Sequence, residues 1–415
     1  MVLLKVKAHK KLLPFLIILV FISCATRAPV TERENGAGKI AISSLPLDKS
    51  GEAIVPEAEV LPDYITILAA GDNLYHEAMI RSGEDGDYGS VYGEIRPLLE
   101  KADIAFVNQE TILAGKDFGI SGFPKFNSPQ KVGKAIAEAG FNVVNQATNH
   151  TMDKGEKAVF ADMDFWDTIP QVTVLGIHRT EEQRSLPQLI EKNNIKTGFL
   201  SYTYGTNNIP VPADKPYLVS VINTTIMAKE IDALRPLCDF LVVSMHWGEE
   251  YEASSDKTQE DLAAFLAEHR VDLVIGHHPH VIQPIVNIAR PDGGTMLCFY
   301  SLGNLISAQT QNPSLLGALA YIKVEKIPRG PDKAGAGISI KETGAIPLVT
   351  HYEKDFTGFK VYPLYAYTGE LLEKHWKNQR KMELTMDYLD NLAATVLGNR
   401  EILKDPFEYE EVSSK

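Results

Sequence analysis

The chain has 415 residues, of which 44% are hydrophobic and 8% aromatic, enough for one large globular domain or two ordinary ones. Acidic residues outnumber basic ones by 54 to 41, giving a net charge of −13. Basic residues do not cluster in the body of the chain, which argues against a nucleic-acid backbone as partner. An acidic ligand could then bind only through local positive charge, which a metal ion would supply.

The first 24 residues have the pattern of a bacterial lipoprotein signal. Four lysines precede the uncharged run Leu12–Ile22, which is too short for a spanning helix of about 20 residues. The sequence Phe21-Ile22-Ser23-Cys24 resembles a lipobox, where signal peptidase cuts before the cysteine and its thiol is lipidated. We expect residues 1–23 to be a signal peptide and Cys24 the lipidated end of an extracytoplasmic, membrane-anchored protein. An uncut anchor or an ordinary signal peptide are the alternatives.

The segment after the lipidated cysteine, residues 24–62, has scattered charges, Gly, Ser and Pro without a sustained period, which predicts a flexible tether. From Tyr64 onward, short β-branched runs alternate with helical patterns, and this predicts a domain over residues 63–350. The predicted strands cover residues 65–72, 102–111, 141–149, 196–203, 238–248, 271–280 and 296–304.

Three helices are predicted between these strands, over residues 128–140, 155–168 and 258–269. In the first, Ser128 would cap the helix, Pro129 would occupy its first position and Gly140 would end it. The alternation of strands and helices predicts an α/β layered fold. Cys238 and Cys298 lie in apolar runs and are expected to be reduced and packed in the core.

The C-terminal part of the chain has a different composition. Residues 328–344 are rich in Gly, Pro and Lys and predict a hairpin loop between the last strands. Residues 351–415 are expected to form a C-terminal strand and a charged helical extension, with residues 374–397 as one surface helix.

Polar side chains follow strand after strand at the carboxyl ends. In open α/β sheets, binding sites form outside these ends, so the polar groups define one predicted site. Its members are Asp72, Glu110, Asn149, His150, His246, His278 and His280.

Several members of this set have a structural alternative. Asp72 and His76 could reach one cation, but Asp72 could instead cap the following helix. A buried Glu110 needs either a metal or a salt bridge. His150 could face a substrate as an acid with Asp153 orienting it, or Asp153 could be a helix cap.

The later motifs add ligands and their surroundings. His246 is predicted to be a ligand, with Trp247 and Gly248 narrowing its loop, and the acids at 249 and 250 are expected to be a solvated rim. His278 and His280 flank Pro279, and His277 is expected to support the neighbouring ligands. Ser301 and Asn304 follow, with Gly303 allowing close backbone approach.

Imidazole, carboxylate and amide ligands without cysteine favour Mn²⁺, Fe²⁺ or Zn²⁺. With six or seven candidate ligands, one or two ions are possible. One ion could generate hydroxide, and two could stabilise a phosphoryl displacement.

The motifs GDNLYH, NQET, TNHTMDKG, MHWGEEY, GHHPH and YSLGN, in this order over residues 65–306, resemble the CapA family of capsule and poly-γ-glutamate synthesis proteins. That family is similar in fold to calcineurin-like metallophosphoesterases, which implies a sandwich of two mixed sheets flanked by helices. The matching positions are Asp72, Glu110, Asn149, His150, His246, His278 and His280. Unlike the ordinary metallophosphoesterase pattern, the first motif has no His two residues after Asp72, and Glu110 replaces a bridging Asp.

The resemblance implies a role at the membrane surface in making, exporting or anchoring an anionic polymer, alongside membrane-embedded synthase subunits. The first hypothesis is a metal-dependent hydrolase or transferase acting on a phosphoester or on the γ-amide polymer. The alternatives are a non-catalytic factor that binds polymer or synthase and keeps the metal as a brace, and a generic envelope phosphodiesterase or nucleotidase. For a nucleobase, Tyr202, Tyr204 or Trp247 could supply an aromatic contact.

Overall fold

The computed structural model describes residues 64–83, 87–328, 336–398 and 401–407. The predicted signal peptide, the lipidated Cys24 and the tether lie outside these residues. Within the described part, no helix combines the length and the apolar character needed to cross a bilayer.

The first sheet has a parallel half and an antiparallel half. Its order is β14-β13-β12-β1-β2-β3-β4, with β11 paired in parallel to β1 at its carboxyl end. Strands β1 to β4 are parallel, and β12 to β14 form an antiparallel meander beside β1. The bounds are β1 (Tyr64–Asn73), β2 (Ile104–Gln109), β3 (Val143–Asn145), β4 (Thr173–Leu175), β11 (Asn304–Ile306), β12 (Leu316–Pro328), β13 (Ala336–Glu353) and β14 (Thr357–Pro363).

The second sheet has the order β5-β6-β7-β8-β10-β9, with parallel pairs in the middle and an antiparallel pair at each edge. Its strands are β5 (Gln188–Lys192), β6 (Ile195–Thr203), β7 (Phe240–His246), β8 (Leu273–His277), β9 (Ile285–Ala289) and β10 (Thr295–Phe299). Both sheets are therefore mixed.

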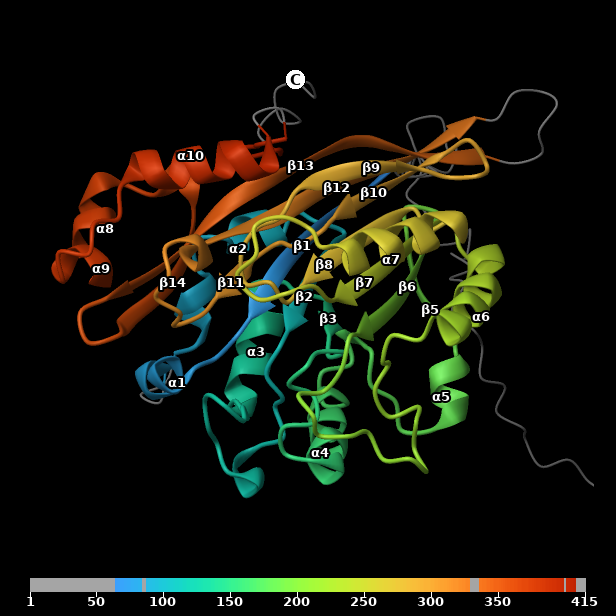
Figure 1. Ribbon diagram of the computed structural model, residues 1–415, viewed down its shortest axis with the longest axis horizontal. Helices are drawn as coiled ribbons and strands as arrows, with labels where there is room; N and C mark the ends of the chain where they lie inside the picture. The colour runs from blue at the N-terminus through green and yellow to red at the C-terminus, as the bar shows by residue number, and fades with distance from the viewer. Residues whose placement is uncertain (1–63, 84–86, 329–335, 399–400, 408–415) are drawn as a thin grey trace, which may run out of the picture. The chain divides into compact units, whose positions relative to one another are not determined.

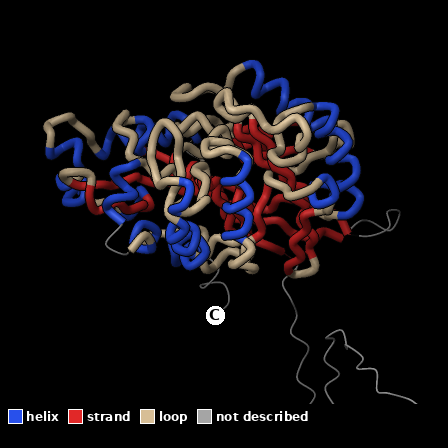
Figure 2. Tube along the Cα trace, turned by 90° about the horizontal axis from the view of Figure 1, so that it is seen from below, coloured by secondary structure: helices blue, strands red, loops and turns tan. Residues whose placement is uncertain are grey.

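Helices cover the outer faces of the sheets, and Figure 2 shows them around the strands. The α-helices are α1 (Glu77–Gly83), α2 (Arg96–Leu99), α3 (Gln130–Ala139), α4 (Glu156–Trp166), α5 (Glu181–Ser185), α6 (Thr224–Leu234), α7 (Lys257–Glu268), α8 (Gly369–Lys374), α9 (Trp376–Gln379) and α10 (Met386–Leu397). Short 3-10 helices are η2 (Gly89–Tyr92), η3 (Lys116–Phe118), η4 (Arg235–Leu237), η5 (Pro313–Leu315) and η6 (Leu364–Ala366).

The main core lies between the two sheets. One continuous cluster of buried side chains joins Ile67 and Phe106 of the first sheet to Phe240 and Ile275 of the second. A second cluster packs α6 and α7 against the outer face of the second sheet, where α7 is visible in front of β7 and β8 in Figure 1. Burial of this apolar area is the main force holding the layers together. The predicted α/β sandwich of two mixed sheets is confirmed.

The predicted strands all exist, with shorter bounds at several ends, and residues 296–304 divide between β10 and the start of β11. The helices at 155–168 and 258–269 are α4 and α7, and Gly140 ends α3 in the left-handed region, as predicted. The predicted cap of α3 is wrong. Extended Pro129 occupies the N-cap, and the Ser128 hydroxyl instead contacts the Thr111 hydroxyl at 2.7 Å.

The C-terminal prediction needs a second correction, because residues 374–397 do not form one helix. They divide into the end of α8, α9 and α10, and the Thr385 side chain caps α10 by accepting from the Tyr388 N–H at 3.1 Å. α10 buries Leu389, Ala393 and Leu397 and is not merely a surface helix. The domain boundary predicted at residue 350 is also wrong, because it falls inside β13. The strand after it, β14, pairs with β13 and belongs to the first sheet.

Residues 336–344, predicted as part of a hairpin loop, are strand in β13, and residues 329–335 lie outside the described part. β12 and β13 pair antiparallel on either side, as a hairpin requires. Cys238 and Cys298 are both free; Cys298 is buried and Cys238 is half-buried.

Candidate metal centre

The predicted site residues lie at the carboxyl ends of strands from both sheets. Asp72 lies at the end of β1, Glu110 follows β2, and His246 ends β7. The loop after β8 provides His278 and His280. The backbones of β1 and β11 approach closely here: a Cβ on Gly71 would stand 1.9 Å from the Gly303 carbonyl oxygen, which accepts the Asp72 N–H at 2.8 Å.

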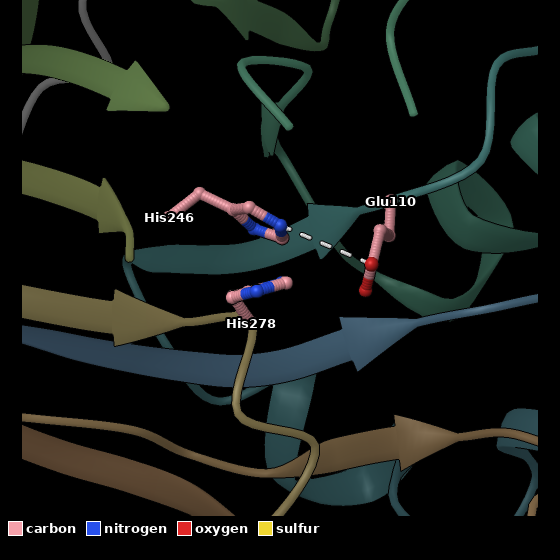
Figure 3. A group of neighbouring side chains, drawn as sticks. All are labelled: Glu110, His246 and His278. Atoms are coloured by element: carbon pink, nitrogen blue, oxygen red, sulfur yellow. Dashed lines mark ion pairs between the residues drawn. The ribbon is translucent and has the colours of Figure 1, made fainter. Parts of the chain in front are cut away.

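Glu110 is the centre of the arrangement. Its side chain is fully buried, and neither carboxylate oxygen accepts a hydrogen bond. Oε1 lies 3.8 Å from His246 Nε2 and 3.7 Å from His280 Nε2. Figure 3 shows the carboxylate pointing toward the imidazoles of His246 and His278. Burial raises the pKa of Glu110 well above its usual value. An unpaired buried carboxylate is costly, so this position calls for a cation.

Asp72 is also fully buried, but it has partners. Its Oδ1 accepts from Asn108 Nδ2 at 2.7 Å, and its Oδ2 lies 3.0 Å from His280 Nδ1. Burial alone would raise the pKa of Asp72, but the hydrogen bond and charge of His280 outweigh it and hold the pKa below its usual value. These contacts point into the cluster, so Asp72 is engaged there and not as a cap of α1.

His280 carries the compensating charge. Burial would lower its pKa, but the carboxylates of Glu110 and Asp72 raise it to about 9. His278 has the opposite balance, because burial and the neighbouring His280 lower its pKa to about 3. In the metal-free chain, a proton retained within this group offsets the buried negative charge, and a cation would replace that proton.

Three overlapping groups bring ligand atoms within 4.8 Å of one another: Glu110 with His246 and His278, Asp72 with Glu110 and His280, and Glu250 with His278 and His280. Glu110 belongs to two of them. The geometry therefore accommodates two neighbouring cation positions with Glu110 between them. Glu250, predicted as a solvated rim, is exposed, yet its carboxylate belongs to the third group.

The backbone of this loop is strained. His278 has φ 100° and His280 has φ 59°, and Tyr251 of the facing loop has φ 68°. Side chains with a Cβ seldom adopt positive φ, and such conformations concentrate where geometry serves a function. Here they turn two imidazoles toward the same carboxylates.

The Asn149–His150 motif lies beside this cluster. Asn149 Oδ1 is 3.0 Å from His246 Nε2. His150 Nδ1 contacts Asp153 Oδ2 at 2.7 Å, and the same oxygen accepts the Phe126 N–H at 2.7 Å. Asp153 does not cap α4, which begins after Gly155. The structure thus brings together the residues predicted as acid and as its orienting group.

Three further residues named from the sequence lie around the cluster but in none of its ligand groups. His76 Nδ1 contacts the backbone of Leu74 and Ala308, both at 3.3 Å. Asn304 donates to the His280 carbonyl at 3.3 Å and leaves its own Oδ1 without a partner. His277 stacks on Phe106 with ring centroids 5.6 Å apart, and burial lowers its pKa to about 4.

Two predicted aromatic roles do not fit the structure. Trp247 does not narrow the loop, because it is buried in the second core and donates to the Tyr300 carbonyl at 2.9 Å. Tyr202 is also buried, and its hydroxyl contacts Glu230 at 2.6 Å. Tyr204, by contrast, lies with its ring centroid 4.7 Å from that of His278.

Asn108 was missed from the sequence. It donates to Asp72 and lies 3.4 Å from His246 Nδ1, so it links ligands from the two sheets. Asn145 supports it by donating to Asn108 Oδ1 at 2.6 Å. A signal existed, because Asn108 stands two residues before Glu110, and residues at this spacing on a strand face the same side.

The donor set fits a divalent cation. The cluster offers buried imidazoles and carboxylates, no thiolate, and orphaned polar atoms on Glu110, His277 and His278. Hard to borderline metals such as Mn²⁺, Fe²⁺ or Zn²⁺ prefer these ligands. Fold and site together define an α/β protein with a candidate divalent-metal centre at the carboxyl ends of its strands.

Residues 66–309, more than half of the chain, match the family described as bacterial capsule synthesis protein PGA_cap. The chain belongs to this family, which confirms the resemblance drawn from its motifs.

Two relatives named for capsule or PGA biosynthesis are similar to this chain. The capsule biosynthesis protein CapA of Bacillus anthracis is 26% identical over 62% of this chain and 63% of its own length. The PGA biosynthesis protein CapA of Bacillus subtilis is 23% identical over 67% of this chain and 72% of its own length. The chain therefore spans less than two thirds of the first relative.

Solved structures with similar folds include nucleotidases. The NAD nucleotidase of Haemophilus influenzae aligns with 80% of this chain and 59% of its own, at a TM-score of 0.42 and 11% identity. A 5'-nucleotidase precursor from Thermus thermophilus aligns with 69% of this chain and 54% of its own, at a TM-score of 0.38 and 11% identity. Similarity at this level assigns no activity to this chain.

Proposed function

We propose that this chain acts in the synthesis, export or anchoring of an anionic capsular polymer of the poly-γ-glutamate type, and that it does so as a metal-dependent hydrolase or transferase. The bond it acts on is a phosphoester or the γ-amide of the polymer. Family membership and the names of the two CapA relatives support the polymer. The buried cluster of imidazoles and carboxylates supports the chemistry.

One observation is the main support for a bound metal ion. Glu110 is a fully buried carboxylate without a hydrogen bond, and imidazoles from two strand ends lie within 4 Å of its Oε1. A carboxylate at this depth needs a compensating donor or cation, because an unmet buried charge costs several kcal/mol, on the order of 3–5. A cation bound by Glu110, His246 and His278 removes that cost.

The residues of the site have two proposed roles, metal binding and proton transfer. Glu110, His246 and His278 would hold one ion, and Asp72 with His280 would complete a neighbouring position around the same Glu110. A bound divalent ion supplies Lewis acidity and an activated water or acceptor. His150 contacts Asp153 through Nδ1, which leaves Nε2 to deliver a proton to the leaving group.

The predicted lipoprotein signal supports the proposed location, and the family supports the proposed partners. Lipidation at Cys24 and a tether over residues 24–62 would hold the domain at the outer surface of a membrane, beside membrane-embedded synthase subunits. The polymer would emerge at that surface. Because the chain has a net negative charge, it would bind an anionic polymer through the positive charge of its metal ion.

The metal content of the full-length chain tests this function. The chain is purified without a metal-affinity tag, beside His278→Ala, and both are assayed by elemental analysis and by turnover of phosphoesters and poly-γ-glutamate. We expect one or two equivalents of Mn, Fe or Zn in the parent. The variant should lose at least one equivalent and about a hundredfold or more of the turnover, because a ligand is missing.

His269→Ala is the matched control, since this histidine lies at the end of α7 near Asp232 and outside the cluster. A parent that binds no metal would exclude the enzyme. A parent that binds metal without cleaving either class of substrate would favour the non-catalytic role in binding polymer or synthase.

A further inference from the structure

Two half-exposed tyrosines stand at the two ends of a row of imidazoles. Tyr204 follows β6, and its ring centroid lies 4.7 Å from that of His278. His278 and His280 lie 5.9 Å apart by the same measure, and Tyr251 is 6.1 Å from His280. The row therefore runs from one phenol, across the candidate ligands, to the other phenol.

Tyr204 is held at its backbone, and its side chain is half-exposed. Its N–H donates to the His246 carbonyl at 2.9 Å, which ties it to the end of β7. The ring is almost parallel to that of His246, with 7° between the planes and 6.3 Å between centroids. Its hydroxyl reaches Asn207 Oδ1 only at 3.5 Å, and 46% of the side chain is exposed. A contact this long constrains the hydroxyl only weakly.

Tyr251 is placed by a strained backbone. Its φ is 68°, and its N–H donates to the Pro279 carbonyl at 2.8 Å, so the loop after β7 is fastened to the loop that carries His278 and His280. Gln309 Nε2 donates to its hydroxyl oxygen at 3.2 Å, which fixes the phenol. The side chain is 44% exposed. A strained and half-exposed aromatic at this place is better explained by a ligand than by packing.

Both hydroxyls lie beside groups of the cluster. The Tyr204 hydroxyl hydrogen-bonds with Asn149, and the Tyr251 hydroxyl hydrogen-bonds with Glu250. A phenol hydroxyl can donate one hydrogen bond and accept others, so each can also contact an oxygen atom of a bound ligand. The two rings stand at the two ends of the row of imidazoles.

We propose that Tyr204 and Tyr251 are substrate-positioning residues that hold an oxygen-rich chain on both sides of the reacting bond. The site then favours a bond inside a chain, such as a phosphodiester or an internal link of a polymer, over a terminal monoester. The inference rests on the proposed function, because it assigns the substrate class of the same site. A terminal group would engage the donor on one side only.

The test compares Tyr204→Phe and Tyr251→Phe in the full-length, metal-loaded chain. Tyr365→Phe is the control, because Tyr365 lies on η6 and is 43% exposed, close to the other two. Kinetics are measured with bis(p-nitrophenyl) phosphate and with p-nitrophenyl phosphate. Binding of a short γ-linked glutamate oligomer and of free glutamate is measured by calorimetry, which does not depend on turnover.

Each Phe variant should raise KM for the diester, and Kd for the oligomer, about five- to tenfold, the effect of one lost hydrogen bond. The kcat and metal content should stay near parental values, because neither tyrosine is a ligand. For the monoester and free glutamate, at most one of the two variants should have an effect. Tyr365→Phe should match the parent throughout.

Three results overturn the inference. If both variants match Tyr365→Phe while the parent cleaves the diester or binds the oligomer, the tyrosines have no such role and the proposed function stands. If both variants lose metal or kcat and leave KM and Kd unchanged, they support the centre and not the substrate. A parent that neither cleaves the diester nor binds the oligomer overturns this inference and the proposed polymer function together.

Discussion

Acidic groups lie at both ends of β8, a partly exposed one before the strand and a fully buried one after it, and their hydrogen bonds differ. Before the strand, both carboxylate oxygens of Asp272 accept hydrogen bonds, from Arg290 on Oδ1 and from Arg235 and the Leu241 N–H on Oδ2. After the strand, His278 and His280 face Glu110, whose oxygens accept none. The hydrogen bonds of Asp272 are supplied by the chain itself, whereas the Glu110 oxygens are left free to bind a cation.

This difference separates a structural charge from a functional one. Arg235 lies in η4 and Arg290 follows β9, so Asp272 links both segments to the start of β8. Glu110 accepts no hydrogen bond, and the charge of His280, 3.7 Å from its Oε1, compensates it in the metal-free chain. Asp272 is partly exposed and Glu110 is fully buried, so Glu110 has both the deeper position and the fewer hydrogen bonds.

The largest expected effect tests this distinction in the metal-free chain. In EDTA, Asp272→Asn should lower the free energy of unfolding by about 3 kcal/mol, because an amide oxygen can serve only one of the two arginines. Glu110→Gln should not lower it, because no hydrogen bond is lost and an unpaired buried carboxylate is removed. Urea unfolding of the full-length chain measures both.

Added metal should stabilise only the proteins that keep Glu110. At a metal concentration about 100 times Kd, the parent and Asp272→Asn should each gain about 2.7 kcal/mol, whereas Glu110→Gln should gain far less. Asp292→Asn is the control for Asp272, since Asp292 is a more exposed partner of Arg290. Equal losses for Glu110→Gln and Asp272→Asn in EDTA would make Glu110 a structural acid.

A smaller effect is expected from Asn108, which gives Asp72 and His246 their orientation. Asn108→Ala should weaken metal binding about 10- to 100-fold, because partners that orient ligands contribute on this scale. Calorimetric titration with Mn²⁺ or Zn²⁺ measures this change. Asn142→Ala is the matched control: it accepts the Ala105 N–H at the other end of β2, at 2.9 Å. If both variants bind metal like the parent, the Asn108 bridge does not orient the ligands.

The sequence predicted the parts of this comparison that depend on local pattern. Buried strands with polar residues at their carboxyl ends placed Asp72, Glu110, His246, His278 and His280 at one site, and the structure brings their side chains together. The arginines around Asp272 could not be foreseen, because they come from separate elements and meet only in the fold. Asn108 was not placed at the site, although its spacing to Glu110 was a signal. Tyr204 was expected only as an aromatic contact for a nucleobase; its contact with His278, like that of Tyr251 with His280, joins residues far apart in the chain.

Two local predictions were wrong for physical reasons of the same kind. The Ser128 hydroxyl contacts the hydroxyl of Thr111, which follows β2, and therefore does not cap the helix. The helix expected over residues 374–397 breaks where the His375 ring approaches the Thr350 carbonyl at 3.3 Å and Lys377 Nζ donates to the Thr310 carbonyl at 2.7 Å. Tertiary hydrogen bonds outweigh the modest free energy of helix propensity.

A third buried cluster tests whether an orphaned imidazole alone marks a metal site. His351 and His375 pack with ring centroids 5.5 Å apart; Nδ1 of His351 contacts the Tyr367 hydroxyl at 2.7 Å, and its Nε2 has no hydrogen bond. The nearest carboxylate, on half-exposed Glu353, lies 3.9 Å from this Nε2, and no ligand group among the described residues includes either histidine. A single orphaned nitrogen beside a solvated acid should bind no metal.

These histidines should instead make stability depend on pH. Burial lowers the pKa of both to about 4; the charges of Lys360 and Lys374 add to this at His351, and His351 adds to it at His375. In the unfolded chain these histidines take up protons near the ordinary histidine pKa of 6.5. The stability that they contribute as neutral groups is therefore complete above that pH and is lost as the pH falls from 6.5 toward 4.

We expect a loss of about 1 kcal/mol for the pair between neutral pH and about pH 6, which the double variant His351→Gln and His375→Gln should abolish. Urea unfolding of the metal-loaded chain at the two pH values isolates this effect, because the other clustered histidines are then held by the ion. An unchanged pH dependence in the double variant would remove the pair as its source. Metal bound at His351 would show that an orphaned nitrogen is sufficient, and the contrast between the ends of β8 would then lose its meaning.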